Sequence, residues 1–369
     1  MNKRVGIILI NYQDYAQRFL ANCRDSLRQQ TYPAELSSVI IIDNASSPAT
    51  QEYLQNNYPE ATILPRSDGN YAAANNLGIK TALAQGCDYV VNLNMDTRLS
   101  REWLQELVKA LDLNPQAGLA QSLILLNQPG VDLDSAVDVA ALKINSLGNL
   151  VHFLGFGYTS HHGEQLSAVK EVVGYPLITG YASGCSVIVR REVLEKLSQL
   201  NQGQYYNEEY FMYHDDLELS LKAKLMGYEI VLAPRSRLFH KYEFARSTKM
   251  IYYMERNRYL FLATFYPPIL LALIALPALV MELGLLGYSL LGGWAKERVK
   301  MYRYFFKAST YQQINRERAY LKKISQRPLA ELAKDFTGRL DYQEINNPVL
   351  TWLVNPLLNT YWRIVKQLV

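Results

Sequence analysis

Apolar runs of strand length alternate with segments of helical periodicity through the first third of the chain. Residues 16–27 and 71–85 repeat apolar side chains at helical spacing. The apolar runs around them are residues 5–10, 39–42, 63–65 and 89–93. This alternation is typical of a mainly parallel sheet with right-handed crossovers. It predicts a Rossmann-like α/β fold, a mostly parallel mixed sheet flanked by helices, whose strands end at one shared edge.

Polar residues follow three of these strands, at the edge where α/β proteins bind ligands. They are Asn11, Asp43 and Asp96, and we expect them to share a cleft. Asp43 is suited to accept hydrogen bonds from a nucleobase or a ribose, and Asp96 offers hard oxygen to a divalent cation that holds a diphosphate. A polar turn would equally explain Asp43, and a turn or a helix cap would explain Asp96.

The middle of the chain, residues 127–175, contains scattered glycines and three histidines without clear periodicity. It predicts loops and short strands over the cleft. His161 and His162 are possible metal ligands, although adjacent histidines point apart in a strand and are more often surface residues.

A strand at residues 186–189 and a helix at 191–200 follow the small residues Ser183 and Gly184. Small residues let a substrate approach the backbone. We therefore expect this turn to border the substrate.

Two carboxylates, Asp215 and Asp216, open the next helix. Asp215 is expected to cap it, where the helix dipole favours negative charge. The same field should keep Asp216 ionised, which suits a general base. A strand at residues 229–233 and a basic turn then lead to His240, which is either structural or completes a metal shell beside Asp96.

The segment 269–294 contains one charged residue, Glu282, and is long enough to cross a bilayer. Pro277 and several glycines interrupt it, and Lys and Arg are abundant on both sides. Because a single crossing would leave one basic flank outside, the pattern favours a re-entrant hairpin or an interfacial helix on anionic lipid. A buried helical pair or an oligomer interface is the alternative. Residues 348–369 predict another amphipathic element.

These patterns divide the chain into a catalytic part and two appended parts. Residues 241–249 form a possible loop over the ligand, with Arg246 or Arg256 reaching a diphosphate, or else a basic stretch on lipid head groups. The divisions are 1–260 (halves 1–125 and 126–260), 261–294 for the membrane hairpin or interfacial helices, and 295–369 for a basic, amphipathic helical region.

Composition narrows the functional classes. The net charge of +4 over 369 residues is too small to indicate nucleic-acid binding. Three scattered cysteines indicate neither a disulfide framework nor a zinc site, and we expect a reducing, cytoplasmic setting with no secretory signal before the first strand. Neither a Gly-rich dinucleotide fingerprint nor a P-loop lysine motif is present, so phosphate is better assigned to a metal.

Residues 5–260 contain a series of motifs whose order and spacing together are specific. They are Asn11-Tyr12, Asp43-Asn44-Ala45-Ser46, Asn75-Asn76-x-Gly78, Leu93-Asn94-Met95-Asp96-Thr97, Arg190-Arg191-Glu192-Val193, Phe211-Met212-Tyr213-His214-Asp215-Asp216, His240 and Arg256-Asn257. Together they resemble family 2 of the inverting glycosyltransferases, especially the bacterial rhamnosyltransferase-like branch that builds cell-surface polysaccharides.

The resemblance implies a GT-A fold, a nucleoside-diphosphate sugar donor, Mg²⁺ or Mn²⁺, and a lipid-linked or other glycan acceptor at the cytoplasmic face of the membrane. Asp216 would be the catalytic base, and Asp96 and His240 the metal ligands. The donor side would comprise Asn11, Tyr12, Asp43, Asn75, Asn94 and Arg256, and the acceptor side Ser183, Gly184 and Asp215.

Three positions depart from the family pattern. Asn94 stands where many members have Asp, which lowers the charge of the metal site, and the glycine of the Asn-x-Gly turn has moved to Gly69. Asp215 replaces a frequent Glu. A nucleotidyltransferase, or a non-catalytic scaffold with the same fold, remains an alternative function.

Overall fold

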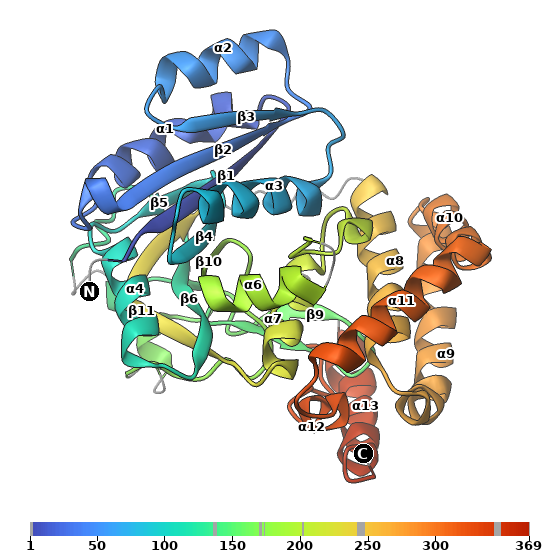
Figure 1. Ribbon diagram of the computed structural model, residues 1–369. Coiled ribbons are helices and arrows are strands. Elements are labelled where there is room, and N and C mark those ends of the chain that lie inside the picture. Colours follow the sequence, from blue (N-terminus) through green and yellow to red (C-terminus); the bar gives the residue numbers. More distant parts are fainter. Residues whose placement is uncertain are drawn as a thin grey trace.

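Four of the strands are those that the apolar runs predict. The structure is a computed structural model that describes residues 3–135, 139–169, 172, 174–200, 203–241, 248–342 and 348–368. Strand β1 (Val5–Tyr12) lies between β2 (Ser37–Asn44) and β4 (Tyr89–Leu93), parallel to both, and β3 (Thr62–Arg66) continues the sheet beyond β2. The parallel α/β half is therefore confirmed (Figure 1).

The other half of the sheet is mixed. Strand β10 (Ser186–Arg190) runs antiparallel between β4 and β6 (Ala117–Leu126), and β11 (Glu229–His240) is parallel to β6. Short strands β5 (Thr97–Leu99) and β7 (Ile144–Ser146) pair with β11 and β6. A separate ribbon is formed by β8 (Asn149–Val151) and β9 (Gly157–Thr159).

Alternating side chains of the strands separate two cores. Ile7 and Leu9 pack with one set of helices, and Ile8 packs with the other. The first set is α1 (Tyr15–Arg28), α2 (Pro48–Asn57) and α4 (Trp103–Leu113), and the second is α3 (Tyr71–Ala84), α6 (Arg191–Leu200) and α7 (Asp215–Leu225). Short 3-10 helices occur at Ala34–Leu36, Leu166–Ala168 and Glu208–Tyr210.

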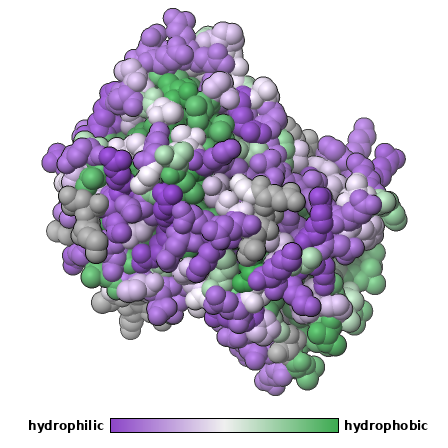
Figure 2. Space-filling model, in the orientation of Figure 1, coloured by the Kyte–Doolittle hydropathy of each residue, from purple (hydrophilic) through white to green (hydrophobic). Residues whose placement is uncertain are grey.

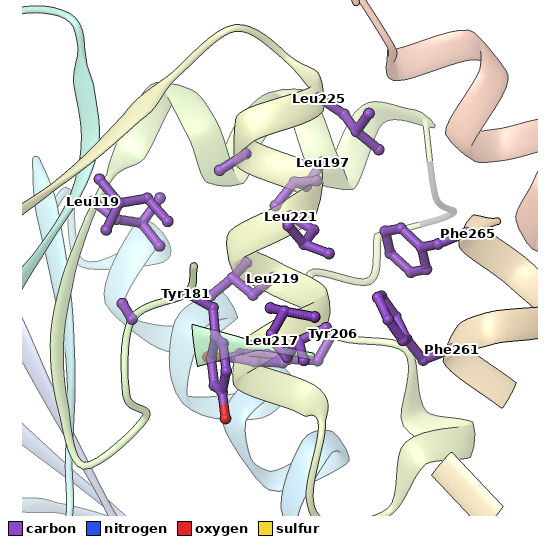
Figure 3. Close-up of a cluster of buried hydrophobic side chains, with 14 of the residues drawn as sticks. Leu119, Tyr181, Leu197, Tyr206, Leu217, Leu219, Leu221, Leu225, Phe261 and Phe265 are labelled. Carbon is purple, nitrogen blue, oxygen red and sulfur yellow. The ribbon is translucent and has the colours of Figure 1, made fainter. Parts of the chain in front are cut away.

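Helix α7 is held against the C-terminal helices by apolar contacts. Leu217 and Leu221 of α7 extend toward Phe261 and Phe265 of α8 (Thr248–Phe265) within one buried cluster (Figure 3). This packing places the start of α7 beside α8.

The C-terminal third is a group of helices beside the sheet domain (Figure 1). After α8 come α9 (Pro268–Leu291), α10 (Ala295–Phe305), α11 (Ala308–Ile324), α12 (Leu329–Ala333), the π-helix η4 (Leu350–Val354) and α13 (Asn355–Val365). The predicted division of the chain at residues 125, 260 and 294 stays a prediction.

Helix α9 corrects the expectation of a re-entrant hairpin, because it is one continuous helix. Pro277 lies inside it and has no N–H to donate to the carbonyl of Leu273. The hydroxyl of Tyr361 in α13 donates to that carbonyl instead. A tertiary contact thus satisfies the group that proline leaves open, and the helix continues.

The predicted basic turn before His240 is also wrong. Arg235 and Arg237 belong to β11, which continues to His240 with a register shift against β6 between Ala233 and Arg237. The register shift lets the polar residues after Ala233 remain part of the same strand. Such β-bulges are frequent beside functional sites.

Candidate active site

A cavity of about 440 Å³ lies where β1, β2, β4 and β10 meet the start of α7. Seven of the residues expected from sequence line it. They are Tyr12, Asn94, Ser183, Gly184, Asp215, Asp216 and His240. The volume falls in the range that small-molecule sites occupy. The carboxyl edge of the sheet and the opening of α7 therefore contribute to one site.

Asp96 and His240 form the metal-type pair of this site. The end of β11 pairs with β5 so that His240 lies opposite Thr97, and Nε2 of His240 is 3.3 Å from Oδ2 of Asp96. Burial alone would raise the pKa of Asp96, but the hydrogen bonds from His240 and Tyr15 bring it below its usual value. Asp96 is therefore ionised at neutral pH.

The pair has a donor set that fits a divalent cation. Oδ1 of Asp96 is buried and accepts no hydrogen bond from any residue that the structure describes. An ionised oxygen in that state is suited to a hard cation. Since Mg²⁺ commonly binds one or two carboxylates together with substrate phosphates and water, a two-residue site is sufficient.

Within the described ranges, no group of three or more His, Cys, Asp or Glu side chains is arranged to hold a metal. His161 and His162 have other contacts. Nδ1 of His161 lies 2.7 Å from Oε2 of Glu164, and Nδ1 of His162 lies 3.4 Å from the carbonyl of Asn145. Both histidines thus have protein partners, and Asp96 is the expected ligand whose buried oxygen has none among the described residues.

Asp216 is held by backbone donors at the cavity wall. Its Oδ2 accepts the N–H of Gly184 over 3.1 Å, and its Oδ1 accepts the N–H of Leu217 over 2.9 Å. Burial raises the pKa of Asp216 to about 6 despite these hydrogen bonds. The expectation that the helix dipole dominates is corrected, since burial is the larger effect. A carboxylate with this pKa is still ionised at neutral pH and is suited to general base catalysis.

Asp215 differs from its neighbour. Burial and the charge of Asp216 raise the pKa of Asp215 well above its usual value, so Asp215 keeps its proton to a higher pH than an exposed carboxyl. Asp215 is the first residue of α7, and the capping position belongs to His214, which makes no side-chain cap hydrogen bond. The expected capping role of Asp215 is therefore wrong.

The loop before Asp215 has an uncommon backbone. Phe211, Tyr213 and His214 have φ angles of 63°, 67° and 62°, a region that residues other than glycine rarely adopt. Such strain persists only where surrounding contacts enforce it, and it often occurs at functional sites.

Asn257 of α8 supplies those contacts. Its buried Nδ2 lies 2.8 Å from the carbonyl of Tyr210, 2.7 Å from that of Met212 and 2.8 Å from that of Tyr213. The sequence identified Asn257 only as part of a matching dipeptide. Its charged neighbours Arg256 and Arg258 gave no local signal that Asn257 would be buried and would bond backbone carbonyls.

Two expected donor residues lie behind the cavity wall. Nδ2 of Asn11 donates to Oδ1 of Asp43 over 2.6 Å, and Ser46 donates to the other oxygen over 2.6 Å. Oδ1 of Asn11 accepts the N–H of Ala16 over 2.7 Å. Both side chains are almost fully buried, and Asn44, the next residue of β2, is the one that lines the cavity.

Two other expected donor residues also lie outside the lining. The guanidinium of Arg256 donates to the carbonyls of Glu209 and Tyr210, the latter over 3.0 Å, and contacts aromatic rings. Asn75 is buried in α3 and donates to the carbonyl of Tyr71 over 3.1 Å. Arg256 thus supports the loop before α7, whereas Arg246 lies outside the described residues.

The shifted glycine turn does reach the cavity. Gly69 has a φ of 69° and donates to Oδ1 of Asn44 over 2.9 Å. A side chain at Gly69 would come within 3.2 Å of the Tyr12 ring. Two residues later, the hydroxyl of Tyr71 lies 3.5 Å from Oδ1 of Asn94. The turn thereby lines the site together with Tyr181 and His214, which the sequence did not single out.

The profile of glycosyl transferase family 2 matches residues 6–198, more than half of the chain. The chain belongs to this family. It is 24% identical over 266 residues to N-acetylglucosaminyl-diphospho-decaprenol L-rhamnosyltransferase from two strains of Mycobacterium tuberculosis, which covers 65% of this chain and 76% of the relative. As a family 2 glycosyltransferase, it has the expected class of activity.

A solved structure shows the same fold. GalNAc-T7 with UDP, GalNAc and Mn²⁺ superposes with a TM-score of 0.53 at 14% identity, over 72% of this chain and 48% of that chain. A mannosyltransferase from Pyrobaculum calidifontis with GDP-Man and Mn²⁺ has a TM-score of 0.47 at 17% identity, over 88% and 86% of the two chains. The first of these likenesses confirms the GT-A type of mixed sheet flanked by helices.

Proposed function

We propose that this protein is a metal-dependent, inverting glycosyltransferase that moves a hexosyl or deoxyhexosyl group from a nucleoside-diphosphate sugar to a hydroxyl of a lipid-linked glycan. It would act at the cytoplasmic face of the membrane, in synthesis of a cell-surface polysaccharide. One observation carries the proposal: Asp216 and His240, the partner of Asp96, border the same cavity. A base and a diphosphate site on one cavity match the requirements of a single displacement.

The donor would bind at the edge of the sheet. Asn94, Tyr12 and Tyr71 line this part of the cavity and offer amide and aromatic surfaces to a nucleotide. Asn11, Asp43 and Asn75 would act on the donor side indirectly, by stabilising the elements that line the cavity. Asn44, next to Asp43 in β2, lines the cavity itself.

Asp96 and His240 would hold Mg²⁺ or Mn²⁺ with the diphosphate. The fit rests on the buried Oδ1 of Asp96 that has no partner among the described residues. When bound, the cation offsets the negative charge that develops on the leaving diphosphate. His240 would keep the Asp96 carboxylate in place through the contact of 3.3 Å.

Asp216 would act on the acceptor. The acceptor oxygen forms a bond to the anomeric carbon while the bond from that carbon to the diphosphate oxygen breaks, and the hydroxyl proton passes to Asp216. The N–H groups of Gly184 and Leu217 keep the carboxylate in position. One displacement inverts the anomeric configuration, so no sugar–enzyme bond is needed.

Ser183, Gly184 and Asp215, whose pKa is raised by burial, would face the acceptor. Asp215 in its protonated form can donate a hydrogen bond to a sugar oxygen, which an ionised carboxylate cannot do. The named relative acts on a lipid-linked diphospho-decaprenol acceptor, which supports a lipid-linked acceptor here. The family match favours sugar transfer over the nucleotidyl transfer that the sequence alone allowed.

Thermal stabilisation by a panel of uridine, thymidine and guanosine diphosphate sugars, with and without Mn²⁺, would identify the donor, since a ligand of the native state raises its melting point. Transfer to a lipid diphosphate glycan is then followed by mass spectrometry, and the anomeric configuration of the product by NMR. A product that retains the donor configuration, or donor binding that ignores EDTA, would contradict the proposal.

A further inference from the structure

Helix α9 is apolar on its exposed side. Its exposed positions are Pro268, Ile269, Ala272, Ala275, Leu276, Leu279, Val280, Leu283, Gly284, Gly287, Tyr288, Leu290 and Leu291. A surface helix of a water-soluble domain carries polar residues on that side. Here the one charged residue of the helix, Glu282, instead contacts other helices of the protein.

A second apolar element lies next to α9. The hydroxyl of Tyr361 in α13 reaches the carbonyl of Leu273, and Ile274 shares a buried cluster with Trp362. The exposed apolar side chains of η4, α13 and their flanks are Val349, Trp352, Leu353, Leu357, Ile364 and Leu368. Together with the exposed side of α9 they form what we call the C-terminal apolar surface. Figure 2 shows it in green at the lower right, where Figure 1 draws α9 and α13.

A cluster of four charges fixes α9 to α8 and α10. Glu282 accepts hydrogen bonds from Arg298 of α10 and from Tyr259 and Tyr302, and its Oε2 lies 3.7 Å from Arg258 of α8. Glu255 of α8 completes the cluster. Its Oε2 lies 2.9 Å from Arg258 and 3.0 Å from Arg298.

This cluster decides the orientation of α9. The helix is long and apolar enough to cross a membrane, but Glu282 lies near its middle. A crossing would carry the cluster into the hydrocarbon core, where charges are strongly disfavoured. It would also draw in α10, whose exposed Lys296, Lys300 and Arg303 follow directly. A helix with its charges turned toward the protein and its apolar side outward is suited to lie along the membrane plane.

The residues at the border of the surface match anionic head groups. Tyr288 is 61% exposed and Trp352 is 81% exposed, and such amphipathic rings favour the interface between lipid and water. Exposed Lys296, Lys300 and Arg363 lie on the helices that carry or follow the surface, and basic residues there are attracted to anionic lipid.

We infer that the C-terminal apolar surface seats the protein on one leaflet of an anionic membrane, with α9 in the membrane plane and both ends of α9 on the same side. The inference rests on the membrane association of the proposed function and is independent of the sugar that is transferred. It excludes a transmembrane role for α9 and assigns the surface to lipid in preference to a second copy of the chain.

Flotation of the full-length protein with preformed vesicles tests the seat. The protein should float with vesicles of phosphatidylcholine and phosphatidylglycerol. With vesicles of phosphatidylcholine alone, the floated fraction should be about 10-fold lower. Leu283→Lys should reduce flotation at least 10-fold. Leu113→Lys is the matched control, because Leu283 and Leu113 are both 60% exposed and Leu113 lies at the end of α4. Equal flotation of the two variants would overturn the inference, as would a detergent-free dimer that ignores vesicles.

Labelling with a membrane-impermeant maleimide tests the orientation. Lys80→Cys reports the sheet domain and Ser309→Cys, in α11, the region after α9. Both side chains are exposed, whereas the native cysteines are buried. With protein added outside sealed vesicles, both variants should label equally before and after detergent. Labelling of Ser309→Cys only after detergent would show a crossing and overturn the inference. Sugar transfer to a water-soluble acceptor analogue, measured without vesicles, reports the proposed function separately.

Discussion

The backbone N–H of Gly184 lies 3.1 Å from Oδ2 of Asp216 and donates to it. The next residue, Cys185, has its side chain beside His240, which contacts Asp96. One dipeptide at the start of β10 therefore connects the group proposed to take a proton with the pair proposed to hold a cation. The two proposed groups are therefore connected through adjacent residues, by the backbone N–H of Gly184 on one side and the side chain of Cys185 on the other.

Substitution of Asp216 separates chemistry from binding. Asp216→Asn keeps the size of the side chain but removes the basic oxygen, so we expect kcat to fall by roughly 10²–10⁴-fold. Donor affinity, measured by calorimetry with Mn²⁺, should change little because the nucleotide is expected at the edge of the sheet. Transfer by the variant at the parental rate would show that another group is the base.

The pH dependence of kcat should follow the ionisation of Asp216. Burial raises the pKa of this carboxyl to about 6, and only the ionised form can accept a proton. At saturating donor, kcat should be constant above that pH and fall about tenfold per unit below it. Because Asp215 shares the titration, the limb reports the pair of carboxyls. A limb that persists unchanged in Asp216→Asn would assign it to another group.

Gly184 limits the space on the acceptor side. A Cβ at this position would lie 3.4 Å from Cβ and 3.7 Å from Oδ2 of Asp216, which is ordinary contact. Gly184→Ala should therefore fold normally and keep donor affinity, while the added methyl group raises the KM for the acceptor by about 10-fold. Gly86→Ala would not be a suitable comparison, since Gly86 has a φ of 79°. Gly284→Ala is suitable, because a Cβ there contacts nothing within 4 Å.

The parallel half of the fold follows from local sequence, and the mixed half does not. The apolar runs of β1, β2 and β4 are short, continuous and bounded by polar turns. The positions of these strands and their alternation with helices could therefore both be predicted. The antiparallel direction of β10 and the pairing of β5 with β11 depend on contacts between distant segments. For the same reason, Pro277 suggested an interrupted helix, because the hydroxyl that replaces its missing hydrogen bond comes from Tyr361.

The sequence predicted which polar residues follow the strands, but not whether each of them faces the cavity or bonds to another group of the protein. Asp216, His240 and Asn94 reach the cavity as expected, whereas Asn11 and Asp43 bond to each other behind its wall. Arg256 was expected at a diphosphate because of its charge, but nearby carbonyls and rings take up its guanidinium. Which of several polar groups faces a ligand is decided by packing, which residue type alone does not encode.

Asp96→Asn tests the cation site. The substitution removes the charge and leaves the shape, so the affinity for nucleoside diphosphate in Mn²⁺ should fall on the order of 10–100-fold. In EDTA, parental and variant proteins should bind equally weakly. Asn94→Asp is the opposite change, since it adds a carboxylate to the cavity wall, and should tighten binding of Mn²⁺. Equal affinities with and without metal would place the cation elsewhere or remove it from the mechanism.

Asn257→Ala should damage the site beyond its cost in stability. The substitution removes a donor from the carbonyls of Met212 and Tyr213, while the Tyr210 carbonyl keeps its hydrogen bond from Arg256. Buried groups that lose a partner lower the free energy of unfolding by about 2–3 kcal/mol. The loop that these carbonyls fix has three residues at positive φ and leads directly into the two carboxylates. Once freed, it should relax toward common backbone angles and move Asp216, so kcat should fall far more than donor affinity.

Asn355→Ala is the matched control for this change. Asn355 is also almost fully buried and also bonds backbone, through the N–H and carbonyl of Leu340 at 2.8 and 3.2 Å, but it lies in α13. The two variants should lose similar stability in urea, measured by circular dichroism, while only Asn257→Ala loses kcat at a temperature where both are folded. Equal losses of kcat would mean that Asn257 acts through global stability alone, because the strained loop would then keep its geometry without the amide that contacts it.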